Sequence, residues 1–253
     1  MNRYISALCL WVTLYGPGAG TVQAFQGVAL PRPEGPFGVG TTVRQWVDST
    51  RLEGFTNDPY DQRRLDVYVW YPAALRSARS PTPYVPNIDE TELVMGADYA
   101  AHVRNVRTNS TIEPALSRRP ALFPVVVFSH GLGSLPMHYT VLAEELASQG
   151  YLVAAINHSF GSAATVLRSR GAQPLHEDWR AGFAISPEAN RFWDDQITDW
   201  AADIVFVVNR LAAENDRATE FFGRRLDLSR VVTMGHSLGG SAALLAGQVD
   251  PRI

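Results

Sequence analysis

The chain has 253 residues, of which 46% are hydrophobic, and a formal net charge of −3. This length and composition predict one domain with a sizeable core, and the small net charge gives no reason to expect a nucleic-acid partner. Cys9 is the one cysteine. If the segment that contains it is removed, the mature chain has neither a disulfide nor a thiol nucleophile.

Residues 1–24 have the pattern of a secretory signal peptide. Arg3 precedes the apolar run 4–15, which is shorter than the roughly 20 residues needed to span a bilayer. Glycine and proline follow this run, and small residues precede a cleavage position near Ala24. We therefore expect cleavage there and a secreted or periplasmic protein. The alternative is a buried N-terminal helix.

The region from 25 to 120 has weaker patterns. Glycine and proline are frequent in 25–60, which predicts a surface segment that leads into the fold. Residues 65–71 alternate as in a strand. One face of this predicted strand carries Leu65, Val67, Val69 and Tyr71. A helix is expected over 89–106, and 84–120 is the segment that we expect to shape the substrate site as a lid.

After Phe123 the sequence alternates between strand and helix patterns. Three apolar, β-branched runs predict strands buried on both faces: 125–129, 151–156 and 230–234. Helical periodicity follows each of them, in 138–150, 187–215 and 241–249. The aromatic residues of the long helix are expected in the core: Phe192, Trp193, Trp200 and Phe206. This order predicts an α/β fold with a parallel sheet and helices on both faces.

Residues 235–239, with the sequence GHSLG, join the last predicted strand to the last predicted helix. A serine in such a motif sits on a tight, strained turn with its Oγ above the sheet. Ser237 also stands at a helix N-terminus, whose dipole favours the negative charge that develops in acyl transfer. We predict that Ser237 is a nucleophile. The alternative is a glycine-rich turn that packs the helix on the sheet.

A second motif, HGLG at residues 130–133, follows the first of the three buried strands. A nucleophilic serine on such a turn needs two oxyanion donors. One is the N–H of the next residue, here Leu238, and the other comes from the loop after an earlier strand. The flanking glycines allow the Leu132 N–H to turn toward the site. We therefore predict Leu132 and Leu238 as the backbone oxyanion donors.

Three histidines lie near these motifs, and each could be either a catalytic base or a structural residue. We expect His130 to be structural and hydrogen-bonded to its loop, and His236 to be a packing neighbour. His158, at a strand end, is ambiguous, and a structural role is favoured. No metal or other cofactor is expected, because the metal-ligand spacings and the third glycine of a dinucleotide motif are absent.

The motifs and their setting resemble the α/β-hydrolase superfamily, and more closely the plasma-type platelet-activating factor acetylhydrolases. The segments that carry this resemblance are VYVWYPA, FPVVVFSHGLGS, LASQGYLVAAINH and DLSRVVTMGHSLGGSAAL. The resemblance covers residues 60–253 and implies a calcium-independent, lipase-like serine esterase, similar to 1-alkyl-2-acetylglycerophosphocholine esterases. Its substrate would be a small ester or a phospholipid with a short or oxidised acyl chain, met in transient contact with a lipid surface. Ser237 would be the nucleophile, and Leu132 and Leu238 would hold the oxyanion.

The chain departs from this family in three places. The animal enzymes carry Phe at the position of Leu238, and His-Arg-Asp at 158–160. In this fold the acid and the histidine of the triad follow the serine. After Ser237, however, the sequence has one acid, Asp250, and no histidine. We therefore expect 25–253 to be a hydrolase domain truncated at its C-terminus, inactive as given, with the triad Asp and His beyond residue 253.

Two alternatives to an acetylhydrolase remain open. One is a broad-specificity carboxylesterase or polyester hydrolase. The other is a non-catalytic binding protein with the hydrolase fold, which the missing acid and histidine would allow. The sequence determines neither the acyl-chain preference nor the oligomeric state.

Overall fold

The structure is a computed structural model, and it describes residues 27–74, 81–167, 171–184 and 186–253. Among these residues, seven strands form one mixed sheet in the order β3-β4-β1-β2-β6-β5-β9. Their bounds in chain order are β1 Gly38–Leu52, β2 Gln62–Ala73, β3 Pro81–Pro83, β4 Arg107–Ile112, β5 Phe123–Ser129, β6 Leu152–His158 and β9 Leu226–Gly235. A separate two-stranded sheet pairs β7 (Ala164–Leu167) with β8 (Gly171–Pro174).

The strand directions confirm the parallel arrangement predicted for the second half of the chain. β5 is parallel to both β6 and β9, whereas β2 is antiparallel to β1 and to β6. In the register of β5 and β9, Ser129 pairs with Gly235. The HGLG loop and the GHSLG turn therefore leave the sheet side by side, at the same edge.

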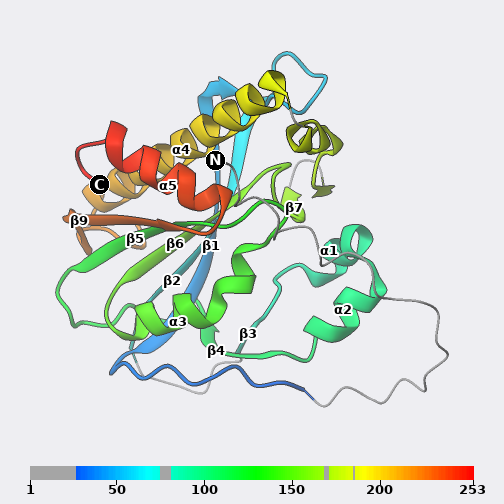
Figure 1. Cartoon of the computed structure of the whole chain (residues 1–253). Helices are drawn as coiled ribbons and strands as arrows, with labels where there is room; N and C mark the ends of the chain where they lie inside the picture. Colours follow the sequence, from blue (N-terminus) through cyan, green and yellow to red (C-terminus); the bar gives the residue numbers. More distant parts are fainter. Residues whose placement is uncertain (1–26, 75–80, 168–170, 185) are drawn as a thin grey trace, which may run out of the picture.

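Helices cover both faces of the sheet (Figure 1). On one face lie α4 (Pro187–Asp216) and α5 (Leu238–Val249). On the other lie α3 (Thr140–Ser148), the 3-10 turn η1 (Pro136–Tyr139), and the short helices α1 (Ile88–Met95) and α2 (Ala97–Val103). A second 3-10 segment, η2 (Glu177–Phe183), precedes α4. The predicted α/β class with helices on both faces is confirmed.

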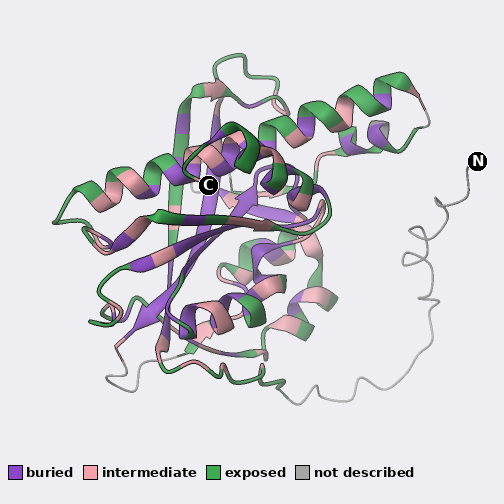
Figure 2. Ribbon diagram, turned by 60° about the vertical axis from the view of Figure 1, so that its left-hand side comes forward, coloured by how far each residue is buried: buried purple, intermediate pink, exposed green. Residues whose placement is uncertain are grey.

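Strand β2 divides its side chains between two cores, one on each face. Its residues packed against α4 and α5 are Leu65, Val67, Val69 and Tyr71, the set predicted from alternation. Tyr68 and Trp70 point to the α3 face. Both faces of the strand are buried, as the central purple strands of Figure 2 show. The alternation in the sequence therefore separates two apolar layers, not a core from solvent.

The prediction of a surface segment over 25–60 is wrong for residues 38–52. The 15 residues of β1 lie in the middle of the sheet, paired along β2 from Gly38 to Leu52. Its two glycines did not prevent a strand here, because pairing with β2, and with β4 at Gly40 and Thr41, supplies the backbone hydrogen bonds that local propensity does not favour. The glycine-rich composition is a weak guide where tertiary pairing decides the structure.

The region 84–120 is only partly compatible with a lid. The single helix expected over 89–106 is divided into α1 and α2 by Gly96, whose φ of 86° is in the left-handed region. Residues 107–112 form β4, which pairs with β1 inside the sheet. A strand held in the sheet cannot open as a lid, so any mobile cover is limited to α1 and α2.

The long helix α4 agrees with its prediction. The Ser186 side chain caps it by accepting a hydrogen bond from the Ala189 amide at 3.1 Å. Trp200 is fully buried, and Phe192, Trp193 and Phe206 pack partly buried against the core, as expected. Within the described ranges, no helix has the length and apolar character to cross a membrane. The predicted signal peptide lies outside the described residues and stays a prediction.

Candidate active site

The turn between β9 and α5 is tight and has a strained backbone at Ser237. β9 ends at Gly235 and α5 begins at Leu238. Between them Ser237 has φ 53° and ψ −123°, an unfavourable backbone conformation for a residue with a Cβ. Ser237 is nonetheless exposed, and its side chain does not cap the helix that it precedes. The sharp turn thus presents a hydroxyl to solvent at the positive end of a helix.

The two glycines of the motif are required by close backbone contacts. A Cβ on Gly235 would overlap the Gly239 carbonyl. A Cβ on Gly239 would overlap the carbonyls of Ser129 and His130 on the neighbouring strand. The motif therefore brings three backbone segments closer together than side chains would permit.

The HGLG loop lies against this turn. A Cβ added to Gly131 would be 3.4 Å from the Ser237 Cβ and 2.8 Å from the His236 Nδ1. Gly133, with φ 66°, donates its N–H to the Gly161 carbonyl at 2.9 Å. The structure thus brings together the two motifs that the sequence predicted to cooperate.

The amides proposed to hold the oxyanion are free. In the part of the chain that the structure describes, neither the Leu132 N–H nor the Leu238 N–H has a hydrogen-bond partner. Leu238 is the first residue of α5, where amides have no acceptor within the helix. Leu132 lies in the loop between two glycines, with its side chain packed against the core. Both amides are available to an external acceptor.

Tyr139 links the loop to the turn. Its hydroxyl lies 3.0 Å from the His236 Nδ1 and accepts the Gly131 N–H at 3.4 Å. A hydroxyl can accept from the amide and donate to the imidazole at the same time. His236 is therefore bound to the neighbouring helix turn η1 and is not a base for Ser237. The sequence analysis did not identify Tyr139, since a tyrosine six residues after such a loop has no distinctive signal.

His130 is structural, as predicted. It is fully buried, with its Nδ1 donating to the Gly131 carbonyl at 2.7 Å and its Nε2 2.7 Å from the Ser162 Oγ. Burial, with a smaller contribution from His158, lowers the pKa of His130 to about 3. A histidine that stays neutral and has both nitrogens occupied holds the loop and cannot take a proton from Ser237.

His158 belongs to a buried Ser-His-Asp arrangement. Its Nδ1 is 2.7 Å from the Asp203 Oδ2, and its Nε2 is 2.8 Å from the Ser129 Oγ. The imidazole also stacks on Trp200, with 3.9 Å between ring centroids. All three polar side chains are fully buried, so a substrate cannot reach the Ser129 hydroxyl. The ambiguity over His158 is therefore resolved in favour of a structural role.

Asp203 connects this arrangement to two arginines. Its carboxylate accepts from Arg63 at 2.7 Å and from Arg51 at 2.6 Å, and Arg63 also binds Glu53 at 2.8 Å. Burial alone would raise the pKa of Asp203, but Arg63 and His158 together hold it below its usual range. Burial lowers the pKa of His158 in spite of the neighbouring carboxylate. A neutral imidazole therefore lies beside an ionised carboxylate.

The sequence contains a signal for Asp203 that the motif analysis did not use. Asp203 lies three residues after Trp200 and one before Ile204, on the apolar stripe of α4. A charged residue in such a stripe has to be paired when it is buried. That reasoning would have predicted a cationic partner, although not which of the arginines provides it.

No base for Ser237 is found among the described residues. No hydrogen bond joins the Ser237 hydroxyl to a histidine in these ranges. Asp250 binds Arg252 after the end of α5, away from the turn. The residues described also contain no cluster of three or more His, Cys, Asp or Glu side chains that could hold a metal ion. Among the residues that the structure describes, the candidate site thus has an exposed hydroxyl and two amides without a partner, and no histidine hydrogen-bonded to that hydroxyl.

Known proteins resemble this chain in sequence and fold. The platelet-activating factor acetylhydrolases of Cavia porcellus and Canis lupus familiaris are 25% and 24% identical to it over 91% and 92% of the chain. A probable 1-alkyl-2-acetylglycerophosphocholine esterase of Arthroderma benhamiae is 24% identical over 88%. A ferulic acid esterase from Streptomyces cinnamoneus superposes with a TM-score of 0.72 and 28% identity over 90% of the chain.

The matches extend beyond this chain. It spans 55% and 56% of the two mammalian enzymes and 60% of the ferulic acid esterase chain. The family model described as platelet-activating factor acetylhydrolase, isoform II, matches residues 22–181. That match includes the HGLG loop and the buried His158, and it covers well over half of the chain. The chain therefore belongs to the platelet-activating factor acetylhydrolase, isoform II, family.

Proposed function

We propose that this protein is a serine ester hydrolase, with Ser237 as the nucleophile and the Leu132 and Leu238 amides as oxyanion donors. The single observation that carries the proposal is the strained, exposed Ser237 beside two unpartnered amides. Backbone strain at an exposed serine has a cost, and it persists where the surrounding structure fixes it for a function. Membership of an acetylhydrolase family agrees with the same chemistry.

The reaction would proceed through an acyl-enzyme. The Ser237 Oγ attacks the ester carbonyl carbon while a general base takes its proton, and the carbonyl oxygen becomes an oxyanion. The Leu132 and Leu238 amides stabilise this oxyanion, each by about 3 kcal/mol in comparable enzymes. The intermediate then collapses, the alcohol leaves with the proton, and water hydrolyses the acyl-serine.

For the substrate, we propose an ester with a short or oxidised acyl chain, including phospholipid esters. The family membership and the names of the relatives support this class. A broad carboxylesterase is the second candidate, because the similar ferulic acid esterase is named for an aromatic acid ester. We also propose that the protein is exported, on the pattern of residues 1–24.

The test is hydrolysis of p-nitrophenyl butyrate by the protein expressed from its complete gene. Ser237→Ala should lower kcat/KM by about 10³-fold or more. Ser241→Ala, four residues further and also exposed, is the matched control and should leave the rate unchanged. Turnover by Ser237→Ala at the normal rate would refute the proposal. No turnover by the unaltered protein would favour the non-catalytic binding protein.

The rates on two substrates separate the candidate specificities. An acetylhydrolase should prefer a phospholipid with a short sn-2 acyl chain over methyl ferulate at equal concentration. A broad carboxylesterase should show the opposite order.

A further inference from the structure

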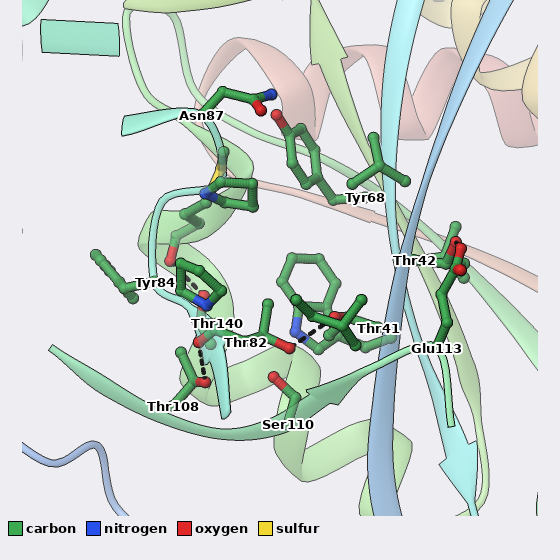
Figure 3. Close-up of a pocket in the computed structure, with 17 residues that line it drawn as sticks. Thr41, Thr42, Tyr68, Thr82, Tyr84, Asn87, Thr108, Ser110, Glu113 and Thr140 are labelled. Carbon is green, nitrogen blue, oxygen red and sulfur yellow. Dashed lines mark hydrogen bonds between the residues drawn. The ribbon is translucent and has the colours of Figure 1, made fainter. Parts of the chain in front are cut away.

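A second cavity lies away from Ser237, on the α3 side of the sheet (Figure 3). Its volume is about 320 Å³, within the range of small-molecule sites. Strands β1, β2, β3 and β4 form its walls together with η1 and the start of α3. Two strands, β6 and β5, separate β2 from β9, so the cavity is roughly 14 Å across the sheet from the strand that carries Ser237.

Most hydroxyl groups around the cavity already have partners. The Thr41 and Thr82 hydroxyls are 2.9 Å apart, and Thr108 donates to the Thr82 carbonyl at 2.6 Å. Thr42 donates to Glu113 at 2.6 Å, and Thr140 donates to the Met137 carbonyl at 2.6 Å. Figure 3 shows the first two of these contacts as dashed lines along one wall. These groups are satisfied within the protein and are not available to bind a ligand.

Several polar groups around the same cavity have no hydrogen-bond partner among the described residues, and three of them belong to residues that are at least nine-tenths buried. Tyr68 and Trp70 are each 5% exposed, and among the described residues neither the Tyr68 hydroxyl nor the Trp70 indole N–H has a hydrogen-bond partner. The Ser110 Oγ is buried without a partner as well. Buried polar groups are nearly always hydrogen-bonded, and an unmet one costs about 1–3 kcal/mol. Ser110 Oγ is the fully enclosed one of the three, whereas the Tyr68 hydroxyl and the Trp70 N–H remain open to an acceptor that enters the cavity from outside.

The charge of the lining limits what that acceptor can be. Of the 17 residues drawn, Glu113 alone carries a charge, and it is exposed and already bound to Thr42. No cation in the lining could neutralise an anionic ligand. Burial also raises the pKa of Tyr68, so its hydroxyl remains protonated and able to donate. The rest of the lining is mainly apolar and aromatic, including Val69, Tyr84 and Met137, with the Asn87 amide beside Tyr68.

We propose that this cavity binds a small neutral molecule with an apolar body and one acceptor oxygen, which receives a hydrogen bond from the Tyr68 hydroxyl. Ketones, ethers and esters belong to this class. The site is separate from Ser237, and the proposal does not depend on the hydrolase function. Water is the alternative occupant, and it would satisfy the same donors without selecting an apolar ligand.

Butyrophenone is a suitable probe because it has one carbonyl acceptor and no hydrolysable bond. Its binding to the purified protein can be measured by calorimetry and compared with butylbenzene, which lacks the acceptor, and with benzoate, which is anionic. Butyrophenone should bind, and benzoate should bind at least tenfold more weakly. Tyr68→Phe removes only an unpartnered oxygen and should weaken butyrophenone binding about three- to tenfold. It should leave the weaker butylbenzene binding unchanged.

Two controls make the result decisive. Tyr60→Phe removes a tyrosine hydroxyl at a residue that is 85% exposed and should have no effect. Ser237→Ala should also leave butyrophenone binding unchanged, which separates this site from the proposed catalytic one. Absence of butyrophenone binding, or equal binding by Tyr68→Phe and the unaltered protein, would overturn the proposal. A water-filled cavity would give the first of these results.

Discussion

The His158 Nδ1 and the Asp203 Oδ2 are 2.7 Å apart in the interior of the protein, and both side chains are fully buried. Through His158, Asp203 on α4 is connected to Ser129 at the end of β5. The Ser129 carbonyl in turn accepts a hydrogen bond from the His236 amide at 3.1 Å, next to Ser237. A buried ion-pair network thus supports both backbone segments that form the candidate site.

Removal of Asp203 should destabilise the fold strongly. Asp203→Ala leaves Arg63 buried without one of its two carboxylates, and breaking a buried pair costs about 3–5 kcal/mol. Asp195→Ala, at an exposed position of the same helix, is the control and should change stability by less than about 0.5 kcal/mol. Urea unfolding measures both. A loss below about 1 kcal/mol in Asp203→Ala would show that the network does not support the fold.

Stability should decrease as the pH falls from neutral toward 4. Burial lowers the pKa of His130 to about 3 and also lowers that of His158, whereas both ionise near 6.5 in the unfolded chain. Below 6.5 the unfolded state therefore binds protons that the native state does not, so its population rises. Each histidine contributes a slope of up to about 1.4 kcal/mol per pH unit in this window.

Two histidine variants test this pH dependence, one at a buried position and one, as the control, at an exposed position. His130→Gln should flatten the stability profile between pH 6.5 and 4, because one of the two depressed groups is absent. His102→Gln, at an exposed position, should leave the slope as it is. Denaturant unfolding at several pH values gives the slopes, and identical slopes in the two variants would contradict the assignment to His130.

Strain at Ser237 should be visible in stability. Glycine tolerates φ 53° without steric cost, whereas alanine does not, so Ser237→Gly should be more stable than Ser237→Ala by about 1 kcal/mol. Ser241 in α5 provides the inverse control, since alanine is favoured over glycine inside a helix by about 1 kcal/mol. Thermal unfolding of the four variants should give opposite orders at the two positions. The same order at both would argue against strain in the turn.

The close approach at Gly131 gives a test of the oxyanion loop. In Gly131→Ala the new Cβ would be 2.8 Å from the His236 Nδ1, so either the His236 ring or the loop with the Leu132 amide must move. If the proposed hydrolase is active, kcat should fall about 10²-fold, the effect of losing one oxyanion donor, with a smaller change in KM. Gly54→Ala introduces a Cβ with no atom within 4 Å and should have the parent kinetics. Equal kcat in both variants would place the oxyanion donor elsewhere.

The second half of the fold could be predicted from the sequence because the same residues carry local and tertiary information. Val125, Val126 and Val127 are apolar, β-branched and buried on both faces, so one pattern identifies the strand and its parallel setting. β1 was not predicted, since Gly38 and Gly40 indicate a turn locally. A Cβ on Gly40 would meet the Tyr71 ring, and that contact depends on β2.

In the candidate site, too, features marked by local sequence could be predicted, whereas contacts between distant segments could not. The placement of Ser237 and Leu132 on adjacent turns could be predicted, because glycines at fixed spacing mark those turns; the roles of the two residues stay predictions. Asp203 and Tyr139 were not predicted, because each contacts a residue distant in sequence, at 45 and 97 positions. Spacing rules describe turns within one segment, whereas hydrogen bonds between segments depend on the completed packing.

The most direct test of the central claim is covalent labelling of the hydroxyl itself. The protein expressed from its complete gene is incubated with a fluorophosphonate probe, and the adduct is mapped by peptide mass spectrometry. We predict one adduct, on Ser237, which is absent from Ser237→Ala and present in Ser241→Ala. An adduct on another serine, or none on a protein that still hydrolyses p-nitrophenyl butyrate, would contradict the assignment of Ser237 as the nucleophile.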